Sequence, residues 1–193
     1  MIVILIINIL VVCFSLMLDL WIHQYQHFYF STIVLAIMIN ALINLVSLGT
    51  FDFITNTTTL MLIAWFIVQK YVEIHTHRYV VNHQKFIAGI LAMMFSLSLL
   101  ITFQTSEDSY YMSLPYLAPA IFIFGAIILF LSKAPSRYKV ALYQKLKQPA
   151  FVGTIVIILS FSIMTILTPF WFVFLIIHAL LITYLLWQKT FQI

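Results

Sequence analysis

Residues 151–187 read FVGTIVIILSFSIMTILTPFWFVFLIIHALLITYLLW and contain no Asp, Glu, Lys or Arg. As one straight helix, this stretch would be close to twice as long as a bilayer span requires. Thr168 and Pro169 interrupt it. Proline donates no amide hydrogen bond and disfavours helix at the residue before it. We therefore predict two membrane-spanning helices joined by a tight hairpin, rather than one kinked helix.

The whole chain is also strongly apolar and poor in charged residues. Of its 193 residues, 64% are hydrophobic and only 7% are charged, and the mean hydropathy is +1.13. A soluble domain carries roughly a quarter charged residues, so most of this surface must face lipid. The sequence contains no flexible linker, low-complexity tract or internal repeat. We predict an all-α transmembrane bundle that forms a single integral membrane domain over residues 1–193.

Apolar stretches along the chain predict seven crossings. Six is the alternative count, because the first and third stretches are near the short end of what spans a bilayer. The chain begins with apolar residues and has no basic segment or cleavage pattern, so we expect the first helix to be retained. The predicted spans lie near residues 2–18, 30–49, 57–72, 86–104, 115–132, 151–167 and 170–187.

The basic residues predict the orientation. With seven crossings, every Lys and Arg falls in connections that share one side of the membrane, and this side is the cytoplasmic one. The amino terminus is then outside and the carboxyl terminus inside a cytoplasmic membrane. Many lysines against few arginines, with abundant Ile and Phe, are typical of an AT-rich bacterial genome. The basic residues are Lys70, Arg78, Lys85, Lys133, Arg137, Lys139, Lys145, Lys147 and Lys189.

Five histidines fall in the predicted cytoplasmic connections. The first two are spaced i, i+4 and would share a helical face if the first helix continued far enough, and the next two form an H-x-H pair suited to an extended segment. Such a cluster can bind zinc, nickel, copper or iron, although no recognised ligand spacing is present. Ordinary interfacial histidines and a pH-sensing cluster are the alternatives. These residues are His23, His27, His75, His77 and His83.

Several polar residues lie within predicted spans. His178 is near the middle of the last span, where ionisable groups often mark a pathway or a ligand site. Asn40 and Asn44 stand one turn apart on the second span, and Asn8 lies on the first. Each of these side chains can line a solute path or hydrogen-bond to a neighbouring helix. The candidate partners of His178 on the preceding helix are Ser160, Ser162 and Thr165.

Small residues predict how some helices pack. Gly125 and Gly153 mark expected points of close helix approach, and Pro115 and Pro119 are expected to begin or kink the fifth span. Cys13 is the only cysteine, which excludes an internal disulfide and a thiolate metal cage.

The connection over residues 134–148 is basic and contains apolar residues at near-helical spacing. We predict a short interfacial helix that contacts anionic lipid head groups, with docking of a cytoplasmic partner as the alternative. The residues that would make these contacts are Arg137, Lys139, Lys145 and Lys147.

The sequence contains no recognised catalytic motif, and no cofactor is required by it. We predict a non-enzymatic binding or transport module, or a membrane subunit of a larger complex, in which His178, Asn40 and Asn44 face a cavity. One alternative is a membrane sensor, regulatory or immunity-type interaction protein, and the other is a metal-binding protein that uses the histidines. Expected partners are the lipid bilayer and a membrane or cytoplasmic protein, but not nucleic acid.

Overall fold

The computed structural model describes residues 2–26, 28–76, 85–105, 114–132, 149–166 and 168–187. Within these ranges the chain is all-helical, with seven helices and no β-strand. Each of the seven apolar stretches forms a helix, as predicted. The helices are α1 (Ile2–Ile22), α2 (Phe30–Leu48), α3 (Phe53–Thr76), α4 (Lys85–Thr105), α5 (Leu114–Leu131), α7 (Pro149–Thr165) and α8 (Trp171–Trp187).

Three of the helices, α1, α2 and α4, are long and apolar enough to cross a bilayer, and they indicate a membrane protein. Shorter apolar helices cover Tyr116–Leu131, Pro149–Thr165 and Trp171–Tyr184. Helix α3 is longer than its predicted span, because it continues past Lys70 and Glu73 to Thr76.

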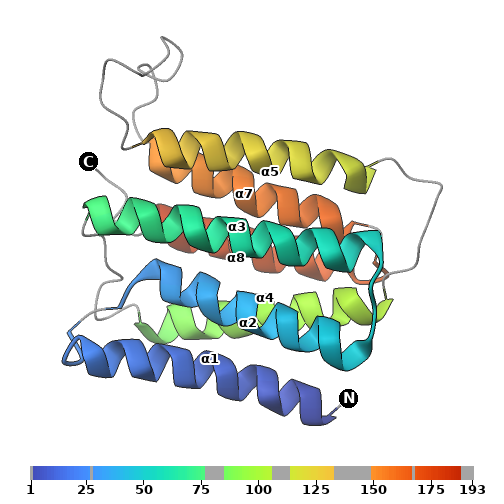
Figure 1. Cartoon of the computed structure of the whole chain (residues 1–193), viewed down its shortest axis with the longest axis horizontal. Coiled ribbons are helices and arrows are strands. Elements are labelled where there is room, and N and C mark those ends of the chain that lie inside the picture. Colours follow the sequence, from blue (N-terminus) through green and yellow to red (C-terminus); the bar gives the residue numbers. More distant parts are fainter. Residues whose placement is uncertain are drawn as a thin grey trace.

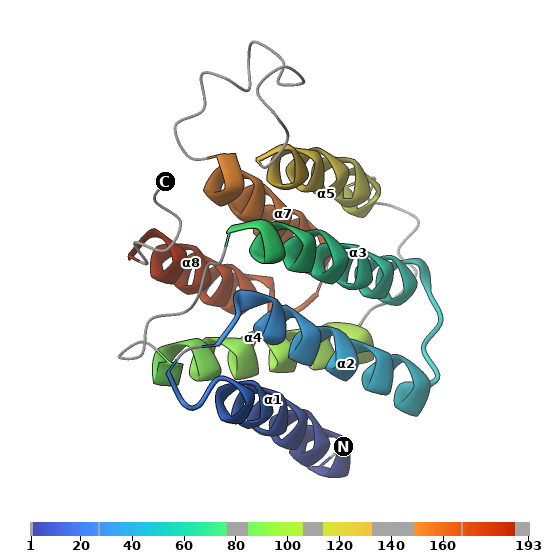
Figure 2. The ribbon, with the colours of Figure 1, turned by 60° about the vertical axis from the view of Figure 1, so that its left-hand side comes forward.

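The helices form a bundle of two layers in which consecutive helices run in opposite directions (Figure 1). One layer has the order α5, α3, α2, α1, and the other has the order α7, α8, α4, with α4 also packed against α1 (Figure 2). Helices α1 and α3 end, and α2 and α4 begin, at the left of Figure 1. We call this the lysine end, because Lys70 and Lys85 lie in helix turns there.

The hairpin between the last two helices is confirmed. Helix α7 ends at Thr165 and α8 begins at Trp171. The backbone N–H of Thr168 donates to the carbonyl of Thr165 at 3.1 Å, and its hydroxyl donates to the same oxygen at 2.7 Å. Thr168 therefore satisfies a carbonyl that the end of α7 leaves free, and Pro169 follows where the chain reverses.

The core lies between the two layers and is rich in aromatic rings. Trp65 of α3 and Phe161 of α7 have ring centroids 5.7 Å apart, and Phe161 meets Phe95 of α4 edge-on at 5.8 Å. All three side chains are fully buried. They join helices that are far apart in the sequence, so they fix the two layers against each other.

Helices α5 and α7 approach closely at two glycines. A Cβ atom added to Gly153 would lie 2.6 Å from the backbone nitrogen of Leu129 and 2.8 Å from the carbonyl oxygen of Gly125. A Cβ added to Gly125 would lie 3.0 Å from the carbonyl oxygen of Gly153. The close approach predicted from these glycines is confirmed, and the structure identifies the partner of each as the other's helix.

Candidate functional site

The buried asparagines form one cluster that joins three helices. The side-chain amide of Asn8 donates to Asn44 Oδ1 at 2.8 Å, and the amide of Asn44 donates to Asn8 Oδ1 at 3.2 Å. The amide of Asn40 donates to the carbonyl of Asn8 at 2.9 Å and to Ser96 Oγ at 2.5 Å. Helices α1, α2 and α4 are thus connected through polar groups that are almost completely buried.

The side chains of Asn8 and Asn44 hydrogen-bond to each other in both directions. Each amide is both donor and acceptor to the other, and Asn8 also donates to the carbonyl of Ile4 at 2.8 Å. Asn40 Oδ1 has no hydrogen-bond partner among the described residues. An amide pair of this kind holds helices together in lipid, where an unpaired amide is costly, and it leaves few free groups for a solute.

A double-mutant cycle should detect this pair. We expect Asn8→Ala and Asn44→Ala each to lower the free energy of unfolding by about 1–3 kcal/mol, because each leaves the other amide buried without its partner. The double variant should lose less than the sum, with a coupling of about 0.6–1.7 kcal/mol. Reversible unfolding in mixed detergent micelles measures all four proteins, and strictly additive losses would contradict a direct pair.

His178 is buried on the side of α8 that faces α7, where it meets Ser162, one of its predicted partners. Its Nδ1 lies 2.7 Å from Ser162 Oγ, and the Ser162 hydroxyl also reaches the carbonyl of Ile158 at 3.2 Å. Both bonds form together when Nδ1–H donates to the hydroxyl oxygen and the hydroxyl donates to the carbonyl. Nε2 is then an acceptor, and it has no partner among the described residues. The ring packs against Phe95, with centroids 4.8 Å apart.

Two carboxylates cap the amino terminus of α2. Tyr29 occupies the N-cap position and makes no side-chain cap bond of its own. Its backbone N–H donates to Asp19 Oδ2 of α1 at 2.9 Å, and the N–H of Ser31 donates to Glu73 Oε1 of α3 at 2.8 Å. Free N–H groups and the positive end of the helix dipole favour negative charge at this position. The cap therefore fastens α2 to both of its neighbours at the lysine end.

Glu73 is a buried acidic residue whose capping role the sequence did not predict. Its side chain is 1% exposed, and Gln69 Nε2 donates to the same Oε1 atom at 2.9 Å. Glu73 Oε2 and Gln69 Oε1 are two acceptors without a donor among the described residues. In the sequence, Glu73 follows an apolar stretch beside Lys70 and resembles an ordinary charge at a helix end.

The described histidines do not assemble into a metal site. Helix α1 ends at Ile22, before His23, and His27 lies outside the described residues. His23 lies in the following turn, with Nδ1 at 2.8 Å from the carbonyl of Asp19 and 3.3 Å from its Oδ1. His75 is still helical, in the last turn of α3, and its partner in the H-x-H pair, His77, lies outside the described residues.

In the part of the chain that the structure describes, no group of three His, Cys, Asp or Glu side chains could hold a metal ion. Three of the predicted metal ligands, His27, His77 and His83, lie outside the described residues. The same holds for the basic connection, with its proposed lipid or partner contacts Arg137, Lys139, Lys145 and Lys147.

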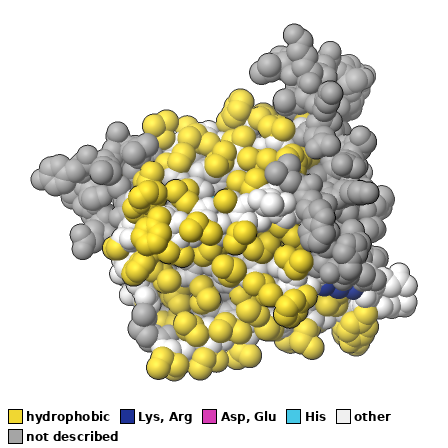
Figure 3. Space-filling model, turned by 180° about the vertical axis from the view of Figure 1, so that it is seen from behind, with side chains coloured by type: hydrophobic (Ala, Val, Ile, Leu, Met, Phe, Trp, Pro, Cys, Tyr) yellow, Lys and Arg dark blue, Asp and Glu magenta, His cyan; other side chains and the backbone are white. Residues whose placement is uncertain are grey.

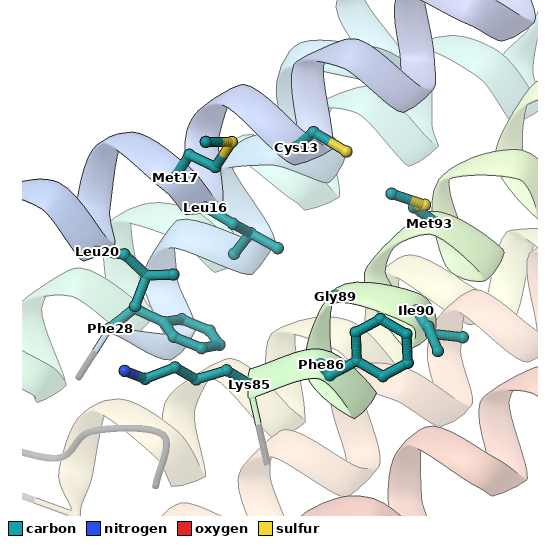
Figure 4. A pocket seen from close by; sticks show the side chains of 10 residues that line it. All are labelled: Cys13, Leu16, Met17, Leu20, Phe28, Lys85, Phe86, Gly89, Ile90 and Met93. Carbon is teal, nitrogen blue, oxygen red and sulfur yellow. The ribbon is translucent and has the colours of Figure 1, made fainter. Parts of the chain in front are cut away.

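A groove opens between α1 and α4 on the side of the bundle. Its volume is about 420 Å³, and its wall is almost entirely apolar. Lys85 lies at its lysine end, and the ammonium group donates to the carbonyl of Tyr25 in the turn after α1. The side chains that line it are Cys13, Leu16, Met17, Leu20, Phe28, Lys85, Phe86, Ile90 and Met93, with Gly89 as a gap between them (Figure 4).

A second side pocket, of about 320 Å³, lies where α5, α7 and α8 meet. It has no charged residue in its wall. Its lining residues are Ile121, Leu159, Ser162, Ile163, Ile166 and Leu175. The surface around both openings is apolar where it is described, and Figure 3 shows lysine atoms at one end of this face.

Comparisons with protein-family models, with curated proteins and with solved structures find no match to this chain. The interior clusters and the two side openings are therefore the features that indicate what this chain does.

Proposed function

We propose that this chain is an integral protein of a cytoplasmic membrane with seven crossings, its amino terminus outside and its carboxyl terminus inside. Support comes from the three helices that are apolar enough to span and from the alternating direction of all seven. The described lysines lie at one end of the bundle, whereas Asp52 lies in the turn between α2 and α3 at the other. This distribution matches the positive-inside rule.

Cysteine labelling tests the orientation. In a Cys13→Ala background, Gln24→Cys places a thiol in the exposed turn at the lysine end, and Phe51→Cys places one on an exposed residue at the opposite end. A membrane-impermeant maleimide should label Phe51→Cys on intact cells and Gln24→Cys only after permeabilisation. Equal labelling of both on intact cells, or the reverse pattern, would overturn the proposed topology.

Within that membrane location, we propose a non-enzymatic binding or transport module, or the membrane subunit of a larger complex, that binds its ligand or partner from the side. The observation that supports this choice is that the polar groups inside the bundle bind one another, whereas an open groove lies on its side. Asn8, Asn44 and His178 each make an interhelical hydrogen bond, whereas the groove between α1 and α4 opens on the apolar surface. Apolar pockets with few polar groups are the usual ligand sites of proteins.

Gentle purification tests this function. Tagged protein is extracted in a mild detergent, and native mass spectrometry identifies whatever remains bound in stoichiometric amount. We expect a bound membrane component or protein that His178→Leu does not remove, since the proposed site lies on the flank and not at the histidine. If the purified chain instead carries a solute across reconstituted vesicles and folded His178→Leu or Asn44→Ala protein does not, the pathway is internal and the lateral site is wrong.

A further inference from the structure

We propose that the groove between α1 and α4 binds one acyl chain of an anionic phospholipid whose phosphate is held by Lys85. This inference rests on the proposed membrane location of the chain. It adds the chemical class of the ligand and the residue that selects it.

The shape and the wall of the groove suit an acyl chain. Apart from Lys85 at one end, the lining side chains are aliphatic, aromatic or sulfur-containing (Figure 4). A volume of about 420 Å³ is that of a small-ligand pocket. A protein helix is about 10 Å wide with its side chains and needs a broad apolar face rather than a pocket of this volume. The groove therefore fits a lipid tail better than a helix of a partner.

Gly89 keeps the groove open. Among the described residues, a Cβ atom at this position would contact only Leu16 Cδ1, at 3.4 Å, which is an ordinary van der Waals distance. The space in front of Gly89 is thus not taken up by helix packing, in contrast to the space at Gly153. A larger side chain at residue 89 can grow into the groove without moving the backbone.

Lys85 gives the groove one cationic end. Its ammonium group donates to the carbonyl of Tyr25, which holds the side chain across the mouth of the groove beside Phe28 (Figure 4). An ammonium group has three donors, so two remain for a phosphate. Among the described residues no carboxylate forms an ion pair with Lys85.

The two acidic side chains at the same end of the bundle bind elsewhere. Asp19 accepts from the backbone of Tyr29 and contacts His23, and Glu73 accepts from Ser31 and Gln69. Their carboxyl oxygens accept from backbone N–H groups at the amino terminus of α2 and not from Lys85.

The position of Lys85 in the bilayer favours an anionic head group. Lys85 is the first residue of α4, so in the proposed topology its ammonium group lies at the cytoplasmic interface while the groove extends into the hydrocarbon region. Basic groups at this depth, at the ends of pockets between helices, bind anionic head groups. The second pocket, between α5, α7 and α8, has no such cation and should hold no preferred lipid.

Native mass spectrometry measures the proposed selectivity. The full chain is reconstituted in vesicles of equal parts phosphatidylglycerol and phosphatidylcholine with identical acyl chains, recovered by flotation and then extracted gently. We expect one retained phosphatidylglycerol per chain, favoured over phosphatidylcholine by about fivefold, the factor that one lysine near an interface provides. Lys85→Gln should abolish the preference, whereas Lys70→Gln, at the same end but outside the groove, should keep it.

A second pair of variants tests the acyl-chain site. Gly89→Leu should fill the groove and reduce retention of either lipid, and Met17→Trp, from the α1 side, should do the same if Gly89→Leu does not fold. Ala120→Leu adds similar bulk to an exposed position on α5 and should change nothing. Equal retention of the two lipids by the wild type, or an equal loss in Lys85→Gln and Lys70→Gln, would overturn the proposal.

Two further outcomes separate this inference from the function on which it rests. If the wild-type chain does not float with the vesicles, the membrane location itself fails. If it floats and Gly89→Leu removes a second copy of the chain rather than a lipid, the groove is an interface between copies and only the lipid proposal is wrong.

Discussion

Replacing Gly153 by alanine should separate α5 from α7 and cost more stability than any other single methyl group added to the chain at a glycine. The new Cβ would meet three backbone atoms of α5 within 2.9 Å, and backbone cannot move aside as the tip of a side chain can. The two helices would have to shift apart along their contact, and overpacking of this kind costs about 1–3 kcal/mol or more. Loss of close contact is particularly harmful in lipid, where packing is the main attraction between helices.

Gly89→Ala is the matched control, because it adds the same methyl group to a helix glycine. Among the described residues, the new Cβ atom would meet only Leu16 Cδ1, at 3.4 Å. Thermal unfolding in detergent, followed by size-exclusion chromatography, compares the two variants with the wild type. Gly153→Ala should lower the melting temperature clearly or give aggregated protein, and Gly89→Ala should change little. Similar melting temperatures for the two variants would mean that α5 and α7 do not approach as closely as the structure has them.

Helix packing at Gly153 also shows how far the sequence could predict this fold. The apolar stretches predicted seven helices with limits close to those observed, because a run of apolar residues without charges has few other structures in lipid. Gly125 and Gly153 predicted close approach. Their mutual contact was not predictable, since it depends on which helices are neighbours in the bundle and on their rotation.

The interior polar contacts were predicted by residue type but not by geometry. Asn8, Asn40, Asn44 and His178 are conspicuous in apolar spans, so their use in hydrogen bonds between helices was a natural expectation. Ser96 is an ordinary helix residue in a membrane and gave no indication that it accepts from Asn40. The structure adds that most of the polar groups of these residues are used in bonds within the protein.

The turn after α1 illustrates what local sequence cannot reveal. Gln24 and Tyr25 adopt φ values of +51° and +62°, a conformation that is uncommon for residues other than glycine. No glycine or proline marks the end of the helix there, and the sequence predicted a span that ends near residue 18, whereas α1 continues to Ile22. The N–H of Tyr29 donates to Asp19 Oδ2, and the ammonium group of Lys85 donates to the carbonyl of Tyr25. Both bonds hold this turn in place, and both join residues of different elements.

Glu73→Ala should be strongly destabilising, whereas Glu73→Gln should be tolerated. Alanine removes the acceptor of two buried donors, the N–H of Ser31 and the amide of Gln69, and the lost bonds together cost about 2–4 kcal/mol. Glutamine keeps an acceptor oxygen for both. It also replaces Glu73 Oε2, which has no donor in the part of the chain that the structure describes, by an amide that can donate. Loss of the charge at the α2 dipole should cost only about 0.3–1 kcal/mol.

The free energy of unfolding of both variants, measured in the same detergent as the wild type, tests this account. Asp19→Ala is the control for the other half of the cap, and it should cost less because the Asp19 side chain is partly exposed. If Glu73→Gln is as unstable as Glu73→Ala, the cap needs the negative charge itself and not only an acceptor. If Glu73→Gln folds normally but loses the lateral ligand binding proposed for the chain, Glu73 has a role in function beyond the fastening of α2 to α3.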